Sequence, residues 1–259
     1  MTVYVVATPK GGVGKTTTAA EIAVALTRRH RPVLAIDLDQ QGNLTARLGI
    51  TPDTPVAGTT ADVLTGQTAL TDALTPSPAV PDTAVLAGTH ALADVEAAPP
   101  ADIITFLRDE LPLHTDRWPD TVIDTPPSVG ALTQAGLAAA DITIAPVTPA
   151  VEAFDQLKRL QAVLDARLRR RVNRHATISW VIPTMFDSRA PAGRGRLLDR
   201  EVLTQLRTTY TDRLTPPVRE TVTVRDSYMD ALPISLYAPD TPVAADYQAV
   251  TTLITRSTP

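Results

Sequence analysis

The chain has 259 residues, of which 44% are hydrophobic and 20% charged, and its formal net charge is −4. This length and composition are typical of one globular α/β domain, so we expect residues 1–259 to form a single domain. The absence of cysteine excludes disulfides, thiolate metal sites and cysteine nucleophiles. The acidic net charge gives no overall attraction to nucleic acid, so any such binding requires a local basic patch.

Apolar periodicity predicts a parallel α/β sheet. An apolar run at 3–7 leads through a glycine-rich loop to a helical pattern at 15–29, and a second apolar run follows at 33–36. Such a βαβ unit has parallel strands. Further strands are predicted at 84–87, 121–123, 142–147 and 178–182, and helices at 61–64, 103–110, 132–140, 154–168, 197–210 and 244–254. We therefore expect a mostly parallel, doubly wound sheet with helices on both faces.

The glycine-rich loop has the composition of a phosphate-binding loop. Residues 9–17 read P-K-G-G-V-G-K-T-T, which fits G-x-x-x-x-G-K-[ST] at Gly14, Lys15 and Thr16, with Pro9 at the first glycine. Backbone N–H groups of such a loop converge on phosphates, and the following helix adds its positive dipole. We expect Lys15 to reach the β and γ phosphates of ATP and Thr16 to bind Mg²⁺. The predicted nucleotide-binding residues of the loop are Lys10, Gly11, Gly12, Val13, Gly14, Lys15, Thr16 and Thr17.

Lys10 precedes the glycines, and the pattern K-G-G-V-G-K-T-T resembles the deviant Walker A motif of the ParA/MinD family of ATPases. The chain uses arginine almost everywhere else, and a compact ammonium suits a narrow phosphate cradle. In that family the first lysine crosses a dimer interface to the partner's nucleotide. The resemblance therefore implies a P-loop NTPase fold, an ATP-bridged homodimer, and catalytic roles for Lys10 in trans and for Lys15.

Two aspartate-containing segments resemble the same family. D-L-D-Q-Q-G-N at 37–43 is similar to its switch I, with Gln40 where proline is usual, and V-I-D-T-P-P-S at 122–128 is similar to its Walker B and switch II. The resemblance implies that Asp39 is a catalytic residue that positions the attacking water. The implied magnesium site consists of Thr16, Asp37, Asp39 and Asp124. From the residues alone, either strand-end aspartate is equally compatible with an ordinary helix cap.

The later segments P-V-T-P at 146–149, T-M-F-D-S-R at 184–189 and L-P-I-S-L-Y-A-P at 232–239 are similar to the plasmid and chromosome partition branch. By this resemblance Thr184 and Pro217 are candidate adenine contacts. Arg189, Arg219 and Arg225 are candidate DNA contacts, although each is equally compatible with a surface ion pair. The arginine-rich run at 167–174 fits a solvated helix end or, alternatively, a DNA-binding patch.

These features favour a DNA-partition ATPase that hydrolyses ATP with Mg²⁺ in the cytoplasm, close to the nucleoid. It would bind double-stranded DNA of any sequence as an ATP-sandwich dimer and be released when a ParB-like partner stimulates hydrolysis. The alternatives are a ParA-like ATPase that positions a protein complex or organelle, a MinD-like membrane-associated ATPase, and a metabolic synthetase. Against the membrane alternative, 244–254 carries Asp246 and no lysine or arginine precedes Arg256.

Overall fold

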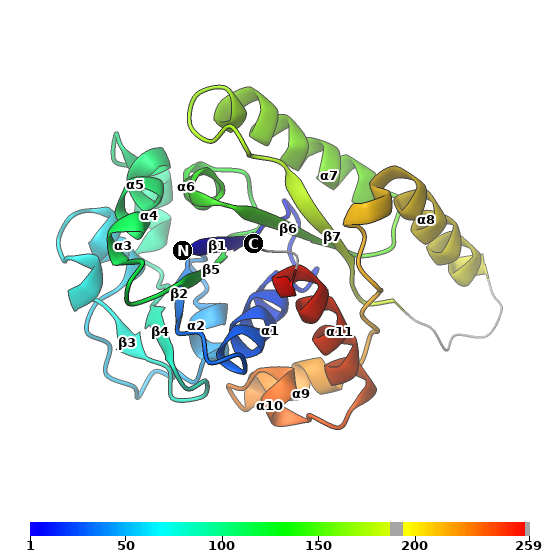
Figure 1. Cartoon of the computed structure of the whole chain (residues 1–259), viewed down its shortest axis with the longest axis horizontal. Helices are drawn as coiled ribbons and strands as arrows, with labels where there is room; N and C mark the ends of the chain where they lie inside the picture. The colour runs from blue at the N-terminus through cyan, green and yellow to red at the C-terminus, as the bar shows by residue number, and fades with distance from the viewer. Residues whose placement is uncertain (187–193, 257–259) are drawn as a thin grey trace.

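The computed structural model describes residues 1–186 and 194–256. At its centre is a seven-stranded sheet in the order β3-β4-β2-β5-β1-β6-β7 (Figure 1). The strands are β1 Thr2–Val6, β2 Val33–Asp37, β3 Thr75–Pro76, β4 Thr83–Leu86, β5 Asp120–Asp124, β6 Ile142–Val147 and β7 Ile178–Pro183. The paired strands are parallel except for β3, which pairs antiparallel with β4. The predicted α/β fold with a mostly parallel sheet is confirmed.

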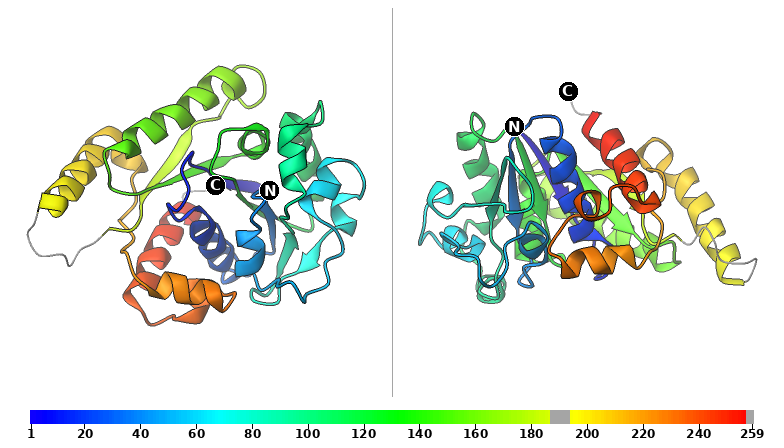
Figure 2. Two further views of the ribbon diagram at one scale, coloured as in Figure 1. Left: turned by 180° about the vertical axis from the view of Figure 1, so that it is seen from behind. Right: turned by 90° about the horizontal axis from the view of Figure 1, so that it is seen from below.

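Helices cover both faces of this sheet (Figures 1 and 2). One face carries α1 Lys15–Thr27, α2 Asn43–Arg47, α9 Thr223–Met229, α10 Ile234–Tyr237 and α11 Pro242–Arg256. The other carries α3 Thr60–Leu64, α4 Leu92–Ala97, α5 Ile103–Glu110, α6 Ala131–Ala139 and α7 Glu152–Val163, which continues as a π-helix over Leu164–Arg169. Helix α8 Arg194–Tyr210 lies beyond the β7 edge. Of the described helices, none combines the length and the apolar character needed to cross a bilayer.

The sheet separates two hydrophobic cores. Along β1, Val3 and Val5 belong to the core under α3 to α7, whereas Tyr4 and Val6 belong to the core under α1, α2, α10 and α11. All four side chains are at most 5% exposed. Burial on both faces favours apolar residues at successive positions, which is why the central strands contain continuous apolar runs in the sequence.

The strand order brings the predicted site segments together. Strand β5 pairs with both β1 and β2, and its register places Asp124 opposite Val6 on one side and opposite Asp37 on the other. The loop that follows β1 and the segment that follows β2 therefore leave the sheet side by side. In open parallel sheets, ligands bind outside the carboxyl ends of the strands at such a point.

Several elements were not predicted by apolar periodicity. They are short, with five residues in α2, six in α4, seven in α9, four in α10 and two in β3. Periodicity needs a window of roughly 11 residues or more to distinguish a helix. Helix α3 did carry a local signal, because Thr59 and Asp62 form a capping box at its start.

Candidate nucleotide-binding site

The loop between β1 and α1 has the backbone geometry that a phosphate cradle requires. Gly12 and Gly14 have φ angles of 71° and 85°, which L side chains rarely adopt. Gly14 is the N-cap of α1 and no side chain caps the helix there. The first amides of α1 therefore face the pocket together with the loop, as anion binding at a helix N-terminus requires.

Lys15 begins α1 and lies inside the site. Its side chain is buried, with 6% exposure, and its Nζ donates to the carbonyl of Lys10 at 2.8 Å. Burial lowers the pKa of the Lys15 ammonium, and the carboxylates of Asp124 and Asp39 oppose that shift. Lys10 itself is exposed at the mouth of the loop. The two lysines of the motif thus occupy different environments.

Asp124 ends β5 directly beside the loop. Its Oδ2 accepts a hydrogen bond of 2.6 Å from Oγ1 of Thr16, and its side chain is fully buried. Burial raises the pKa of Asp124 to about 8, and the neighbouring Asp37 carboxylate adds to the rise. A buried carboxylate with so few compensating donors gains from a nearby cation.

Asp37 ends β2 and is also fully buried, but donors of its own chain surround it. Its Oδ2 accepts from the amide and hydroxyl of Thr45 at 2.9 and 2.8 Å, and its Oδ1 accepts from the amide of Asp39 at 3.1 Å. Burial raises its pKa to about 6, against the effect of these donors. Asp37 therefore holds the turn between β2 and α2 in place and does not line the pocket, and its magnesium role stays a prediction.

The pocket at these strand ends has a volume of about 370 Å³. Asp39 lines it and accepts a hydrogen bond of 3.0 Å from the amide of Gln41 through Oδ1. The other lining residues are Gly11, Gly12, Gly14, Lys15, Thr16, Thr17, Gln41, Asn43, Arg47, Pro127, Met185 and Tyr228. Segments from the start, the middle and the end of the chain therefore meet around one space.

The oxygen atoms beside the loop fit a magnesium ion. Across residues 1–186 and 194–256, no group of three or more His, Asp or Glu side chains is placed to hold a metal. Mg²⁺ does not require such a group, because it usually keeps several waters and takes one or two protein oxygens together with substrate phosphates. The Thr16 hydroxyl and the Asp124 carboxylate supply ligands of that kind next to the phosphate loop.

The two predicted adenine contacts lie at different depths. Thr184 follows β7 and is 1% exposed. Its Oγ1 donates to the carbonyl of Val13 at 2.8 Å, so it supports the phosphate loop from the buried side. Pro217 is half-buried in the segment whose Val218 amide donates to the carbonyl of Pro183. Neither residue lines the pocket, and their adenine role stays a prediction.

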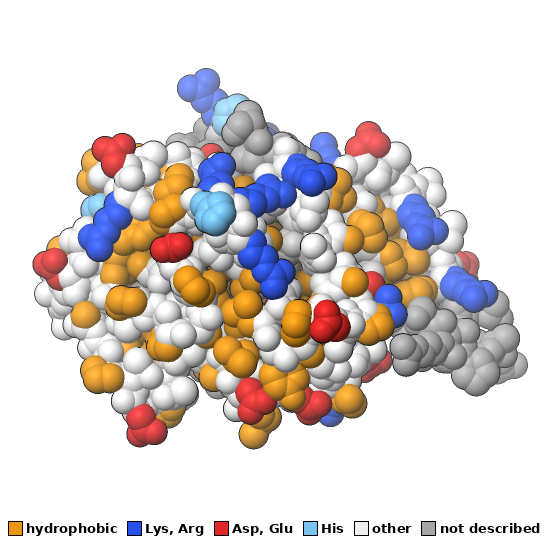
Figure 3. Space-filling view, turned by 60° about the horizontal axis from the view of Figure 1, so that its bottom comes forward, with side chains coloured by type: hydrophobic (Ala, Val, Ile, Leu, Met, Phe, Trp, Pro, Cys, Tyr) orange, Lys and Arg blue, Asp and Glu red, His pale blue; other side chains and the backbone are white. Residues whose placement is uncertain are grey.

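The three predicted DNA contacts have different surroundings. Arg219 forms a bidentate ion pair with Asp246 on α11, with nitrogen to oxygen distances of 2.5 and 2.8 Å. Arg225 is exposed on α9, and Arg189 lies outside the described residues. Figure 3 shows that positive side chains gather on part of one molecular face, whereas the acidic ones are scattered. A cleft between α1 and α11, which sequence patterns did not single out, is lined by Arg28, Arg29 and Arg256 together with Glu21.

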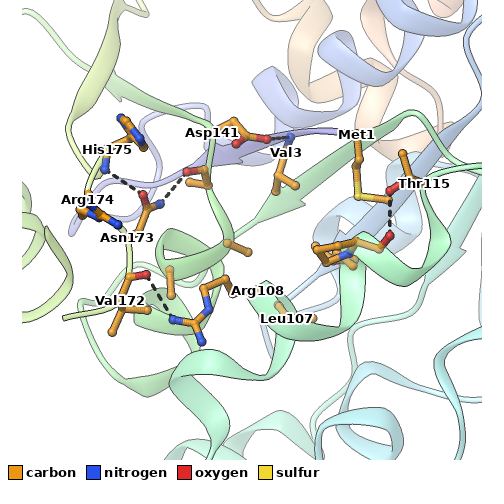
Figure 4. A pocket seen from close by; sticks show the side chains of 15 residues that line it. Met1, Val3, Leu107, Arg108, Thr115, Asp141, Val172, Asn173, Arg174 and His175 are labelled. Carbon is orange, nitrogen blue, oxygen red and sulfur yellow. Dashed lines mark hydrogen bonds between the residues drawn. The ribbon is translucent and has the colours of Figure 1, made fainter.

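A second cavity, of about 710 Å³, lies at the opposite, amino ends of β1, β6 and β7 (Figure 4). Its polar groups bond to the protein itself: Asp141 accepts from the Val3 amide at 2.8 Å, and Asn173 donates to the Ala140 carbonyl at 2.7 Å. Arg108 donates to the Val172 carbonyl at 3.2 Å. The larger cavity therefore lacks the buried, charged groups that mark the pocket at the carboxyl ends.

Comparisons with known proteins agree with this geometry. A family model described as an AAA domain matches residues 1–178. The chromosome-partitioning ATPase Soj of Thermus thermophilus is 33% identical over 248 residues, which cover 93% of this chain and 90% of that protein. The chain belongs to the ParA/Soj/MinD family of P-loop ATPases. The chromosome partitioning protein ParA of Myxococcus xanthus, another similar protein, is 35% identical over 189 residues, which cover 70% of this chain and 64% of that protein.

Solved structures of similar fold extend over nearly the whole ParA/Soj-like chain. Apo McdA of Cyanothece superposes with a TM-score of 0.83 at 21% identity, covering 98% of this chain and 99% of McdA. A Mycobacterium smegmatis protein named cobyrinic acid a,c-diamide synthase, solved with an ATP analogue and magnesium, gives a TM-score of 0.79 at 29% identity. That match covers 99% of this chain and 95% of that chain.

Sequence motifs identified the phosphate-loop side of the pocket but not its opposite wall. Arg47, Tyr228 and Met185 line that wall, and none lies in a phosphate-binding motif. A signal was available for Arg47, because an arginine in the last turn of a short helix directly after the D-L-D-Q-Q-G-N segment must lie near the site. No comparable signal marks Tyr228, which is 181 positions farther along the chain.

Proposed function

We propose that this chain is a DNA-partition ATPase that binds ATP with Mg²⁺, dimerises around the nucleotide and binds DNA only in that state. One observation carries the proposal: the glycine loop, buried Lys15, Thr16 and Asp39 line one pocket at the carboxyl ends of β1 and β2, and Thr16 donates a hydrogen bond to the buried Asp124 at the end of β5. The relatives named for chromosome partitioning, which are 33% and 35% identical, support the same process for this chain.

Each residue of the pocket has a separate task in hydrolysis. The loop amides and Lys15 bind and orient the β and γ phosphates, because they offer fixed positive charge where the transferred phosphoryl group carries negative charge. Bound Mg²⁺, held through Thr16 and Asp124, would neutralise charge on the same phosphates. Asp39 accepts a hydrogen bond from the attacking water and directs it toward the γ phosphate. The products are ADP and phosphate.

The exposure of Lys10 supports a dimer. Its ammonium is exposed at the mouth of the loop, so it can bind phosphate on a second subunit that faces the pocket. Apolar side chains near the same opening support a contact between subunits: Met185 and Tyr228 line the pocket and are 38% and 39% exposed, and Met229, next to Tyr228, is 82% exposed. Exposed apolar groups around a binding site are typical of interaction surfaces.

DNA binding is assigned to basic residues that a two-fold axis would duplicate. Arg225 is the first choice within the described residues, because it is exposed, whereas Arg219 is neutralised by Asp246. Doubling a small arginine patch compensates for the acidic net charge of one subunit. A small centromere-binding partner of the ParB kind would then release the dimer by stimulating hydrolysis, and the protein would reside in the cytoplasm on the nucleoid.

Two alternatives use the same pocket. A ParA-like ATPase that positions a protein complex would share the ATP-gated cycle and differ only in its partner. A synthetase, as the Mycobacterium smegmatis protein is named, would need a substrate site besides the nucleotide pocket. If that reaction took its nitrogen from glutamine through a cysteine nucleophile, this chain would lack the required residue.

A mobility-shift series with ATP, ADP and no nucleotide, on DNA of two unrelated sequences and over rising salt, tests the proposal. We expect retardation with ATP alone, equal for both sequences, and a log affinity that falls with log salt by about 0.9 per phosphate contacted. Equal DNA binding in all three nucleotide states would contradict nucleotide gating. No DNA binding in any state, with ATP binding intact, would favour the alternative cargo.

A further inference from the structure

Arg47 is a buried arginine whose side chain donates hydrogen bonds to a segment far from it in the sequence. It ends α2, is 4% exposed, and reaches across to α9 and the chain that follows it. One terminal nitrogen donates to Oγ of Ser227 at 3.0 Å and to the carbonyl of Leu232 at 3.4 Å, and the other donates to the carbonyl of Val224 at 3.0 Å. The planar guanidinium therefore fixes both the distance and the orientation of α9.

A second contact joins the same two elements at the nucleotide pocket. The hydroxyl of Tyr228 on α9 donates to Oδ1 of Asn43, the first residue of α2, at 2.7 Å. The Arg47 guanidinium lies over the Tyr228 ring, 5.4 Å from its centroid, within the range of a cation–π contact. Asn43, Arg47 and Tyr228 all line the pocket. Both ends of α2 are thus connected to α9.

Helix α9 is short and largely exposed. It has seven residues and no side-chain cap, and Ser227, an acceptor of Arg47, is its buried residue. Val224 packs against the hydrophobic core and the helix also contacts α10, whereas Val222, Arg225 and Met229 on or beside it are exposed. The hydrogen bonds to α2 are therefore a substantial part of what places this helix.

The start of α2 is itself tied to the residues that face the nucleotide. Asp39 and Gln41 line the pocket just before Asn43, and Asp37 anchors the turn through Thr45 inside α2. Asp37 also accepts from the amide of Asp39, so both the pocket segment and α2 are hydrogen-bonded to the same carboxylate at the end of β2. The path from the pocket to the α9 surface therefore consists of contiguous hydrogen bonds.

We propose that Arg47 and Tyr228 are positioning residues that couple segment 39–47 to α9, so that ATP binding changes the placement of the exposed α9 surface. The inference rests on the proposed function, since it requires ATP in the pocket. Helix α9 carries Arg225 and the apolar Val222 and Met229, so the coupling would let nucleotide state control what that surface presents to a macromolecular partner.

The lack of cysteine in the chain provides a clean test. A single cysteine is introduced either at Gln40→Cys, in the pocket segment, or at Met229→Cys, on α9, and is labelled with an environment-sensitive fluorophore. Both positions are exposed. Each labelled protein is titrated with a non-hydrolysable ATP analogue and Mg²⁺, at a concentration where light scattering shows monomers. The titration is repeated with Tyr228→Phe, with Arg47→Lys, and with Tyr237→Phe on α10 as the matched control.

We expect both labels to respond to the analogue in the otherwise unchanged chain and in Tyr237→Phe. In Tyr228→Phe and Arg47→Lys, the Gln40→Cys label should still respond, and its midpoint gives the affinity of each variant for the analogue. At saturating analogue, the response of the Met229→Cys label should fall by about tenfold in Tyr228→Phe, which loses one hydrogen bond to α2, and by at least as much in Arg47→Lys, which replaces a guanidinium that makes three. Tyr228 is partly exposed and its ring is retained, so this variant should fold even if the lysine variant does not.

Three results would overturn the inference, and they can be told apart. A Met229→Cys response that persists in both variants means that Arg47 and Tyr228 only stabilise the fold. A Gln40→Cys response without any Met229→Cys response in the unchanged chain means that α9 does not follow the pocket, although the proposed function stands. No response from either label means that the chain does not bind ATP, and the proposed function fails first.

Discussion

The cavities at the two ends of the sheet differ in chemistry more than in size. The one at the amino ends is larger, at about 710 Å³ against 370 Å³, yet its aspartate, asparagine and one arginine already bond to backbone groups around them. The smaller one is lined by the buried Lys15, by Asp39 and by glycines with positive φ, and its Thr16 donates a hydrogen bond to Asp124, a fully buried carboxylate with a raised pKa.

This difference indicates at which end of the sheet a charged ligand would bind favourably. Removing Asp124 and Lys15 from water costs stability, and a ligand that brings phosphate and a divalent cation would relieve that cost. At the amino ends, a ligand would have to displace hydrogen bonds that the protein already makes. Volume alone would select the amino ends, whereas the buried charges favour the carboxyl ends.

The largest effect is expected from Lys15→Ala. The variant loses the ammonium that binds two phosphates, and charge-assisted bonds of this kind contribute about 1.5–3 kcal/mol each. ATP affinity should therefore fall by about 100-fold or more, as measured by titration with a fluorescent ATP analogue. Lys158→Ala, which changes the exposed lysine of α7, should bind like the unchanged chain. If Lys15→Ala retained full affinity, the phosphate-loop assignment would be wrong.

Asp39→Ala should slow ATP hydrolysis and leave ATP binding intact. Loss of the group that orients the water should slow ATP turnover by about 100-fold or more, because general-base assistance typically contributes that much. ATP binding and the ATP-dependent dimer should remain. Phosphate release assays with Asp94→Ala as the exposed control measure this. Turnover at the normal rate would shift the water-positioning role away from Asp39.

Lys10→Ala should affect the dimer more than nucleotide capture. Its ammonium is exposed and acts only when two loops face each other, so ATP affinity of the monomer should change by less than about threefold. The ATP-dependent dimer should weaken by about tenfold or more, since one charge-assisted bond is lost in each half. Light scattering with and without ATP measures the strength of this dimer. A dimer of normal strength would remove the role in trans.

A smaller effect is expected from Arg225→Ala on DNA binding. Each DNA phosphate that the variant no longer neutralises should flatten the plot of log affinity against log salt by about one unit, without changing the preference among DNA sequences. The matched control is Arg159→Ala, an exposed arginine on α7. An identical change in both variants would mean that the affinity for DNA depends on the overall charge of the protein and not on the α9 surface.

Arg174→Ala, at the amino-end cavity, should have the smallest effect. Arg174 is exposed and far from the carboxyl ends of the strands, so nucleotide affinity should stay within about twofold of the unchanged chain. The same fluorescent titration measures it. A loss comparable to that of Lys15→Ala would reverse the assignment of the two cavities.

The sequence was sufficient for one half of the candidate site because that half is local. Phosphate loops need glycines, a lysine and a threonine at fixed spacing between a strand and a helix, so Lys15 and Thr16 can be identified without any long-range information. The parallel sheet followed from continuous apolar runs, which only strands buried on both faces require.

The other half depends on contacts that no local pattern contains. Arg47 and Tyr228 meet only because α9 folds back over α2, and Arg219 pairs with Asp246 from a different helix. The family resemblance implied a magnesium role for Asp37, which stays a prediction, but it gave no sign that the Asp37 oxygens accept hydrogen bonds from Thr45 and Asp39. A position at a strand end predicts proximity to a site and leaves the hydrogen-bond partners open.

Hydrogen exchange over the whole chain, with and without Mg²⁺ and a non-hydrolysable ATP analogue, shows directly which end of the sheet binds the nucleotide. We predict new protection in residues 10–17, 39–47 and 124–127, at the carboxyl ends of the strands. We predict none in 107–115 or 172–175, which line the amino-end cavity. Protection confined to those two amino-end segments would contradict the assignment of the nucleotide site.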